Sequence, residues 1–130
     1  MENNILFEQF INGKLSLPHK EISFENIPWS KHPSFEGVEL KHIITSSDTN
    51  GEFSFHLVRI APNKKIGMHV HENQLETHEV INGTGTCINN NVKINYSPGI
   101  ISIFPMNIMH EVTASDDGLY LFAKFFPALC

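Results

Sequence analysis

The sequence predicts an all-β fold, a sandwich or barrel of short strands. Apolar and polar residues alternate over segments of several residues, and these segments recur at a spacing of roughly ten residues. Asn-Gly and Pro-Gly pairs, which favour turns, separate several of them. No long amphipathic segment interrupts this pattern, and the one helix expected is a short one near residues 3–10.

The first third of the chain predicts an arm attached to the barrel. Asn12-Gly13, between apolar-rich flanks in Phe10–Leu17, predicts a hairpin turn. Three prolines make Pro18–Ser34 irregular. We therefore expect residues 1–36 to form an N-terminal arm or additional strands, and residues 37–126 to form the barrel core of a single domain.

The alternation assigns side chains to the two faces of the next strands. In "GVELKHIIT" one face carries Val38, Leu40, His42 and Ile44. In "EFSFHLVRIA" one face carries Phe53, Phe55 and Leu57, and the other carries His56, Val58 and Ile60. His42 and His56 are expected to be hydrogen-bonded core residues, with polar pocket groups as the alternative. Further turns are predicted at Asn82-Gly83 and Asn89–Asn91, and "SPGIISIF" and "GLYLFAKFF" are predicted to be buried strands.

Length and composition limit the classes of function. The 130 residues suffice for one hydrophobic core, and 41% hydrophobic with 18% charged residues is typical of a folded domain. A net charge of −5 argues against nucleic-acid and membrane partners, and Arg59 is the only possible guanidinium clamp. The first ten residues resemble no secretory signal, and Cys87 and Cys130 predict free thiols, so a cytoplasmic location is expected.

The segment "HVHENQLETHEVING", His69–Gly83, concentrates three of the eight histidines. His69 and His71 are two residues apart, so on a strand they share a face with Cα atoms roughly 6–7 Å apart. Glu76 follows after a short loop, although Glu72 or Gln74 could take its role. The best candidate for a fourth ligand is His110, at the start of a later strand. Three imidazoles and a carboxylate suit one divalent transition-metal ion, such as Fe, Mn, Ni, Cu or Zn, with positions left open for substrate.

The spacing His69-x-His71-x4-Glu76-x6-Gly83 resembles the first motif of the cupin superfamily, and Gly99-x5-Pro105-x-Asn107-x2-His110 resembles the second. The resemblance implies a double-stranded β-helix, the jelly-roll barrel of small cupins. It implies one metal ion held by His69, His71, Glu76 and His110, and a homodimer. The departures from the family pattern lie at turn or neighbouring positions: Asn63, Ile100, Asn107 and Ala114. None of them affects a ligand position.

His78 is two residues after Glu76 and is expected to face the same interior. It is the candidate catalytic residue, as a proton shuttle, with the roles of ligand partner, replacement ligand or packed core residue left open. The phenylalanines are most simply core residues, and the alternative is that Phe104, Met106, Met109 and Phe122, near the second motif, line a mostly apolar cavity. The hypothesis is a metal-dependent dioxygenase, isomerase or lyase acting on a small organic substrate. The alternative is a non-catalytic module that senses a small molecule or a metal.

Overall fold

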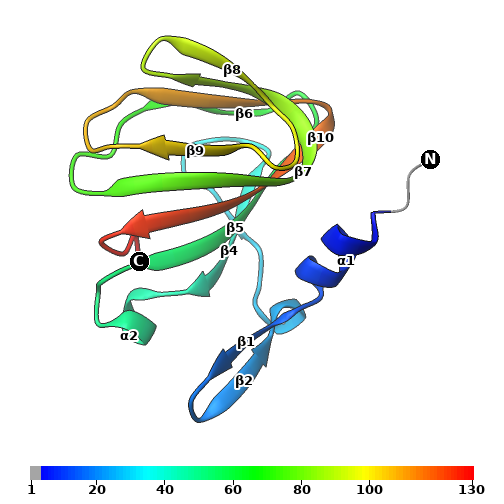
Figure 1. Ribbon diagram of the computed structural model, residues 1–130, viewed down its shortest axis with the longest axis vertical. Coiled ribbons are helices and arrows are strands. Elements are labelled where there is room, and N and C mark those ends of the chain that lie inside the picture. Colours follow the sequence, from blue (N-terminus) through cyan, green and yellow to red (C-terminus); the bar gives the residue numbers. More distant parts are fainter. Residues whose placement is uncertain (1–3) are drawn as a thin grey trace.

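Eight strands form one strongly curved sheet in the computed structural model, which describes residues 4–130 (Figure 1). The strand order is β3-β4-β5-β10-β7-β8, with β6 also paired to β10 and β9 to β7. These strands are β3 (Ser30–Lys31), β4 (Val38–Ile44), β5 (Ser54–Ile60), β6 (Lys65–His69), β7 (Leu75–Asn89), β8 (Val92–Tyr96), β9 (Ile101–Phe104) and β10 (His110–Phe126). A short helix, α2 (Ser46–Thr49), joins β4 to β5. The all-β jelly-roll prediction is therefore confirmed.

The two long strands β7 and β10 hold the barrel together. One half of β10 pairs with β5 and the other half with β6, while β7 pairs with β9 and then with β8. The predicted hairpin at Asn82-Gly83 is wrong, because β7 continues through these residues without a chain reversal. Gly83 has φ 82°, and a Cβ there would collide with the carbonyl oxygen of Gly118 on β10. The glycine therefore allows β7 to bend and to approach β10 closely, and it does not form a turn.

The predicted turn at Asn89–Asn91 is confirmed. Asn90 and Asn91 both have positive φ, and Asn89 pairs with Val92 across the turn between β7 and β8. The buried-strand prediction for "SPGIISIF" is wrong for half of its residues. β9 buries Ser102 and Phe104 but leaves Ile101 and Ile103 exposed, because only one face of this strand meets the interior.

The arm consists of α1 (Ile5–Ile11), a hairpin of β1 (Lys14–Leu17) and β2 (Lys20–Ser23), and the short 3-10 helix η1 (Phe24–Asn26). The helix expected near residues 3–10 is present from Ile5, while residue 3 lies outside the described residues. The predicted turn at Asn12-Gly13 is wrong: Asn12 ends α1, and the hairpin turns at Pro18-His19. A helix rather than a strand precedes Asn12, so the pair acts as a helix terminus.

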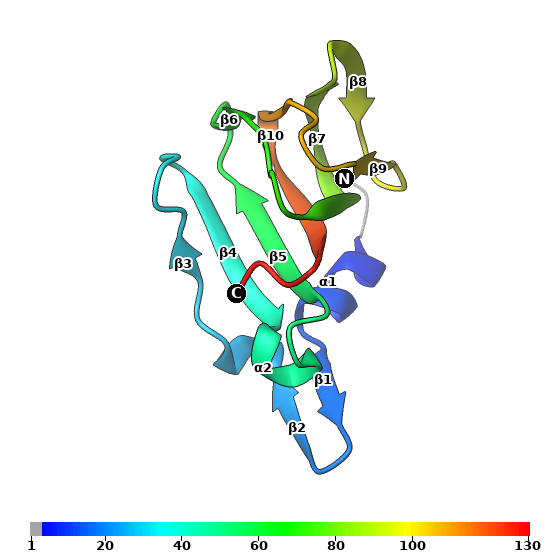
Figure 2. The same cartoon turned by 90° about the vertical axis from the view of Figure 1, so that its left-hand side faces the viewer.

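Two apolar cores lie on opposite sides of β4, β5 and β10. The inner core fills the barrel, with Val58, Ile60, Leu121 and Phe125 among its buried side chains. The outer core packs the arm against the barrel around Phe24, Ile43 and Leu57, with Phe10, Trp29 and Phe122 at its border. Figure 2 shows the arm beside the barrel wall rather than across its interior. Among residues 4–130, no helix is long and apolar enough to span a membrane.

The alternation predicted for β5 is confirmed, since Val58 and Ile60 join the inner core and Leu57 joins the outer core. For β4 the prediction fails at Ile44, which packs in the outer core and pairs with Phe55. A bulge between His42 and Ile44 changes the register, so the last residue of the strand points to the opposite face from His42.

Candidate metal centre

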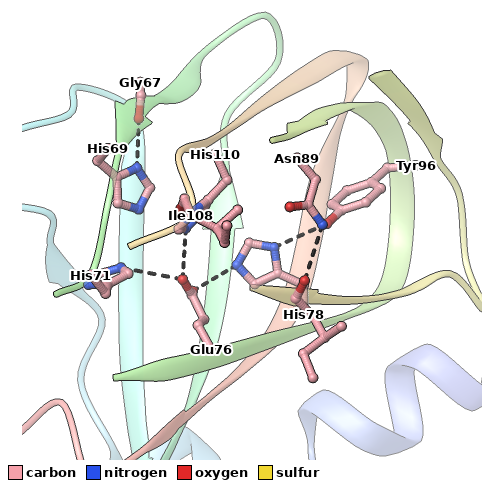
Figure 3. A network of polar contacts seen from close by, with 10 residues as sticks. Gly67, His69, His71, Glu76, His78, Asn89, Tyr96, Ile108 and His110 are labelled. Atoms are coloured by element: carbon pink, nitrogen blue, oxygen red, sulfur yellow. Dashed lines mark hydrogen bonds and ion pairs between the residues drawn. The ribbon is translucent and has the colours of Figure 1, made fainter. Parts of the chain in front are cut away.

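Three elements bring the four predicted ligands together. His69 is the last residue of β6 and pairs with His110, the first residue of β10. His71 follows in the loop after β6, and Glu76 is the second residue of β7. One donor atom from each of the four lies within 4.8 Å of the others (Figure 3). The competing candidates do not join this cluster: Glu72 is exposed, and the Gln74 amide lies 3.4 Å from the Ala128 carbonyl.

The carboxylate of Glu76 is the centre of the cluster. Its Oε1 lies 2.9 Å from Nε2 of His110 and 3.3 Å from Nε2 of His71. Its Oε2 lies 2.8 Å from Nε2 of His78. The ring of His69 completes the group, with its centroid 4.2 Å from that of His110. Both oxygens of one buried carboxylate therefore face imidazole nitrogens.

Two backbone carbonyls fix the orientation of the imidazoles. Nδ1 of His69 lies 2.7 Å from the Gly67 carbonyl oxygen, and Nδ1 of His110 lies 2.9 Å from that of Ile108. A carbonyl oxygen only accepts hydrogen bonds, so each Nδ1 carries the proton. In the neutral ring Nε2 then holds a lone pair. For His110 this lone pair would face the lone pairs of Glu76, so a positive charge must lie between them, either a proton on Nε2 or a metal ion. The donor set therefore fits a metal ion.

Burial and charge favour the ligand forms of these side chains. Burial by itself would raise the pKa of Glu76, but the charge of His78 and the hydrogen bonds from His110, His71 and His78 outweigh it. The pKa of Glu76 is consequently held well below its usual value. Burial, as the largest cause, lowers the pKa of His69. A carboxylate and a neutral imidazole are the states in which these groups bind metals.

His78 lies behind Glu76, away from solvent. It is 2% exposed, its Nε2 contacts Glu76, and its Nδ1 lies 3.2 Å from the hydroxyl of Tyr96. Burial is the main cause that raises the pKa of Tyr96, so this hydroxyl stays protonated. Tyr96 was not predicted. It reaches the site through the pairing of β8 with β7, in which Tyr96 lies opposite Gly85. No local sequence motif indicates this register.

A cavity of about 500 Å³ opens beside three of the four predicted ligands, His69, His71 and Glu76. Its wall is mainly apolar and includes Phe35, Val38, Leu40, Val58, Ile66, Ala123, Phe125 and Leu129. The polar side chains of His32, His42 and His78 also line it. Residues 30–35 and the C-terminal Leu129 and Cys130 form part of the wall, so the last part of the predicted arm contributes directly to the cavity.

The four residues predicted to line an apolar cavity do not line it. Phe104 is buried and stacks on the ring of His110, with centroids 4.1 Å apart. Phe122 points to the outer core, because alternation along β10 turns it away from the interior. Met106 and Met109 follow β9 in the loop before β10, and both are exposed. Proximity in sequence to His110 was therefore a poor guide to the cavity.

Arg59 and the two histidines of β4 and β5 also have defined places. Arg59 lies outside this cavity, 2.8 Å from Glu39 and with its guanidinium carbon 4.0 Å from the centre of the Trp29 ring. His56 is fully buried and both of its nitrogens have hydrogen-bond partners, as predicted for a core histidine. His42 is half-buried and lines the cavity, which matches the alternative prediction.

Comparison with known proteins agrees with this barrel and this cluster. Residues 56–122, more than half of the chain, match the family described as Cupin domain. The chain therefore belongs to the cupin family. The comparison with curated proteins gave no match.

Solved structures share the fold at low sequence identity. A predicted oxalate decarboxylase from Thermotoga maritima superposes with a TM-score of 0.74 at 17% identity, covering 80% of this chain and 96% of that one. KdgF from Halomonas sp. gives a TM-score of 0.70 at 18% identity, covering 79% and 88%. The polyketide cyclase RemF from Streptomyces resistomycificus gives 0.71 at 16% identity, covering 83% and 78%. At these identities the similarity establishes the barrel and not the reaction.

Proposed function

We propose that this cupin binds one divalent transition-metal ion through Nε2 of His69, His71 and His110 and the carboxylate of Glu76. The observation that carries the proposal is the orientation of the rings. Carbonyls hold the Nδ1 protons of His69 and His110, which leaves the Nε2 lone pairs for an ion beside Glu76. Three imidazoles and one carboxylate leave open positions on a five- or six-coordinate ion.

We further propose that the chain is an enzyme acting on a small organic molecule in the adjacent cavity. A bound metal supplies Lewis-acid or dioxygen chemistry, which suits an isomerase, a lyase or a dioxygenase. The mainly apolar wall supports a substrate with few charges. The position of Arg59 outside the cavity supports the same inference, because a phosphate-rich substrate would lack a guanidinium partner there.

His78 is proposed to move a proton at Glu76. Its two nitrogens connect the Tyr96 hydroxyl with Oε2 of Glu76, so a proton can pass along this line without contact with solvent. An imidazole is suited to such transfer at neutral pH. The same contacts also position the carboxylate, and the two roles are separable by experiment.

The metal site is tested by elemental analysis of protein purified without a metal-affinity tag. We expect wild-type protein to hold one more equivalent of metal than the double variant His69→Ala/His71→Ala. The variant should keep its far-ultraviolet circular dichroism, because both side chains lie at the cavity wall rather than in the inner core. Equal metal content in the two proteins would contradict the proposal. His19→Gln, in the β1–β2 turn, is the matched control for loss of a histidine.

The role of His78 is tested with His78→Gln in metal-loaded protein. The amide can still donate a hydrogen bond to Glu76 but cannot relay a proton. We expect metal content to be retained and turnover of a substrate, found by screening small organic acids and alcohols, to fall by about 10²–10⁴-fold. Undiminished turnover would remove the proton-transfer role. Ligands that bind to wild-type protein but are recovered unchanged would instead favour a binding module.

A further inference from the structure

A second group of metal-binding side chains lies on the wall of the same cavity. His42 on β4 and His56 on β5 occupy paired positions of adjacent strands, and Cys130 comes from the C-terminal segment after β10. One donor atom from each lies within 4.8 Å of the others. His42 and Cys130 also line the cavity, whereas none of the three belongs to the Glu76 cluster. We refer to this group as the His42–His56–Cys130 site.

We propose that the His42–His56–Cys130 site binds a second metal ion, of the thiophilic Zn²⁺ type, through Nδ1 of both histidines and Sγ of Cys130. Nδ1 of His42 lies 2.7 Å from Nδ1 of His56 and 3.7 Å from Sγ of Cys130. Tetrahedral zinc, with bonds of about 2.0 Å to nitrogen, places two nitrogens roughly 3.3 Å apart. A small separation of the two rings therefore admits the ion, beside the cavity that His42 and Cys130 line.

The hydrogen bonds around His56 support this assignment. Nε2 of His56 lies 2.7 Å from Oγ of Ser54, which can accept a hydrogen bond from the Nε2–H group. The lone pair then resides on Nδ1, the atom that faces His42. Ser54 therefore has the same role for His56 as the Gly67 carbonyl has for His69. Each bonds one ring nitrogen and leaves the other nitrogen free to bind a metal.

The thiol is held in place by the backbone that precedes it. The amide of Ala128 donates to the Gly51 carbonyl at 3.1 Å, and that of Leu129 donates to Oγ of Ser54 at 2.8 Å. The Cys130 carbonyl accepts from the amide of Ser46 at 2.6 Å. Three consecutive residues are therefore attached to the β4–β5 end of the barrel. Ser54 contacts both the His56 ring and the tail, so one side chain couples two of the three ligands.

The protonation states fit a soft cation. Burial, followed by the nearby His42, lowers the pKa of His56 to about 4, so its ring is neutral near pH 7. Burial raises the pKa of the Cys130 thiol, so it is protonated before an ion arrives. Binding then breaks the S–H bond, forms the metal–sulfur bond and releases one proton to solvent. The sulfur ligand distinguishes this site from the nitrogen–oxygen set around Glu76.

The test uses Co²⁺ as a spectroscopic substitute for Zn²⁺ in the His69→Ala/His71→Ala background, which removes the first site. We expect one equivalent of Co²⁺ to bind and to give a near-ultraviolet thiolate-to-cobalt charge-transfer band, which Zn²⁺ should displace. The band should disappear in a Cys130→Ser variant of the same background. Ser54→Ala should weaken binding by about 10–100-fold, because it frees the His56 ring and the tail together.

Two results would overturn the second site. One is a background protein that binds no Co²⁺ or shows no thiolate band while reduced. The other is a band that persists after Cys130→Ser, which would assign the thiolate to Cys87 instead. Cys130 is exposed, so its replacement leaves folding intact and the result interpretable even where a variant of buried His56 fails to fold. Because the background lacks the Glu76 site, this outcome is independent of the proposed function.

Discussion

His56 is an imidazole that the fold keeps away from water. It is fully buried, between the Ser54 hydroxyl and the ring of His42, and its pKa falls to about 4 mainly because burial penalises the charged ring. In the unfolded chain the same side chain titrates near 6.5. Between these two values the unfolded state binds a proton that the folded state rejects, so stability must fall as the pH falls.

We therefore predict that metal-free protein loses about 2 kcal/mol of unfolding free energy from His56 alone between about pH 7 and about pH 5. The loss begins near the unfolded value and continues toward the folded value of about 4. Urea unfolding in the presence of a chelator measures it.

The matched variant is His56→Gln, which cannot titrate. We expect it to be less stable than wild type at neutral pH but to have a shallower dependence on pH. The same slope in both proteins would show that other groups, such as the half-buried His69, account for the pH dependence.

At the level of single residues, the sequence identified the four side chains that the fold brings together, but not their surroundings. His69, His71, Glu76 and His110 were found because parity along a strand and motif spacing are local properties. Tyr96 and Cys130 were not assigned roles, because strand register and the path of the C-terminal segment bring them to the sites. The residues near His110 were misassigned for a related reason: alternation sends Phe122 outward, and a loop exposes Met106 and Met109.

Among the elements, β7 and β10 depend on one close approach. Gly83 adopts a positive φ at the point where the register between the strands shifts, directly opposite Gly118 and Leu119. This bend lets one half of β7 carry Glu76 and His78 while the other half pairs with β8. An Asn-Gly pair is compatible both with a hairpin turn and with such a bend. The local sequence therefore could not distinguish the two structures.

We predict that Gly83→Ala lowers the free energy of unfolding by about 1–3 kcal/mol from backbone strain, and further through the collision with the Gly118 carbonyl. Gly99→Ala is the control, because Gly99 also has positive φ but an added Cβ there meets open space. Chemical denaturation of both variants separates the two contributions. Equal losses in the two variants would show that the close approach carries no cost.

For the whole molecule, the part of the arm from α1 to η1 and the cavity lie on different sides of the barrel wall. Phe24 is 8% exposed and packs with Ile43 and Leu57 in the outer core, and its carbonyl accepts a hydrogen bond from Lys41. Alternation predicted an all-β sandwich or barrel, and the resemblance to the cupin motifs predicted the jelly-roll barrel. The position of the arm was not, because contacts between segments far apart in sequence leave no periodic signal.

We predict that Phe24→Ala destabilises the protein by about 3 kcal/mol, as expected for loss of a buried aromatic ring. The metal content should be unchanged, since the outer core and the metal cluster share no residue. Urea unfolding and elemental analysis of the same preparation measure both. A coupled loss of metal would contradict the separation of the two faces. The homodimer implied by the cupin resemblance stays a prediction, as does the cytoplasmic location expected from the N-terminal sequence and the free thiols.

The cavity wall has a mixed origin that bears on how such a protein can diversify. The barrel strands carry the metal cluster, but residues 30–35 and 129–130 close the cavity from outside the regular sheet. Insertions or substitutions in these two segments would reshape the chamber without changing strand register or disturbing Glu76. New ligand preferences could therefore be selected, in nature or in a directed library, while the barrel and the Glu76 cluster stay unchanged.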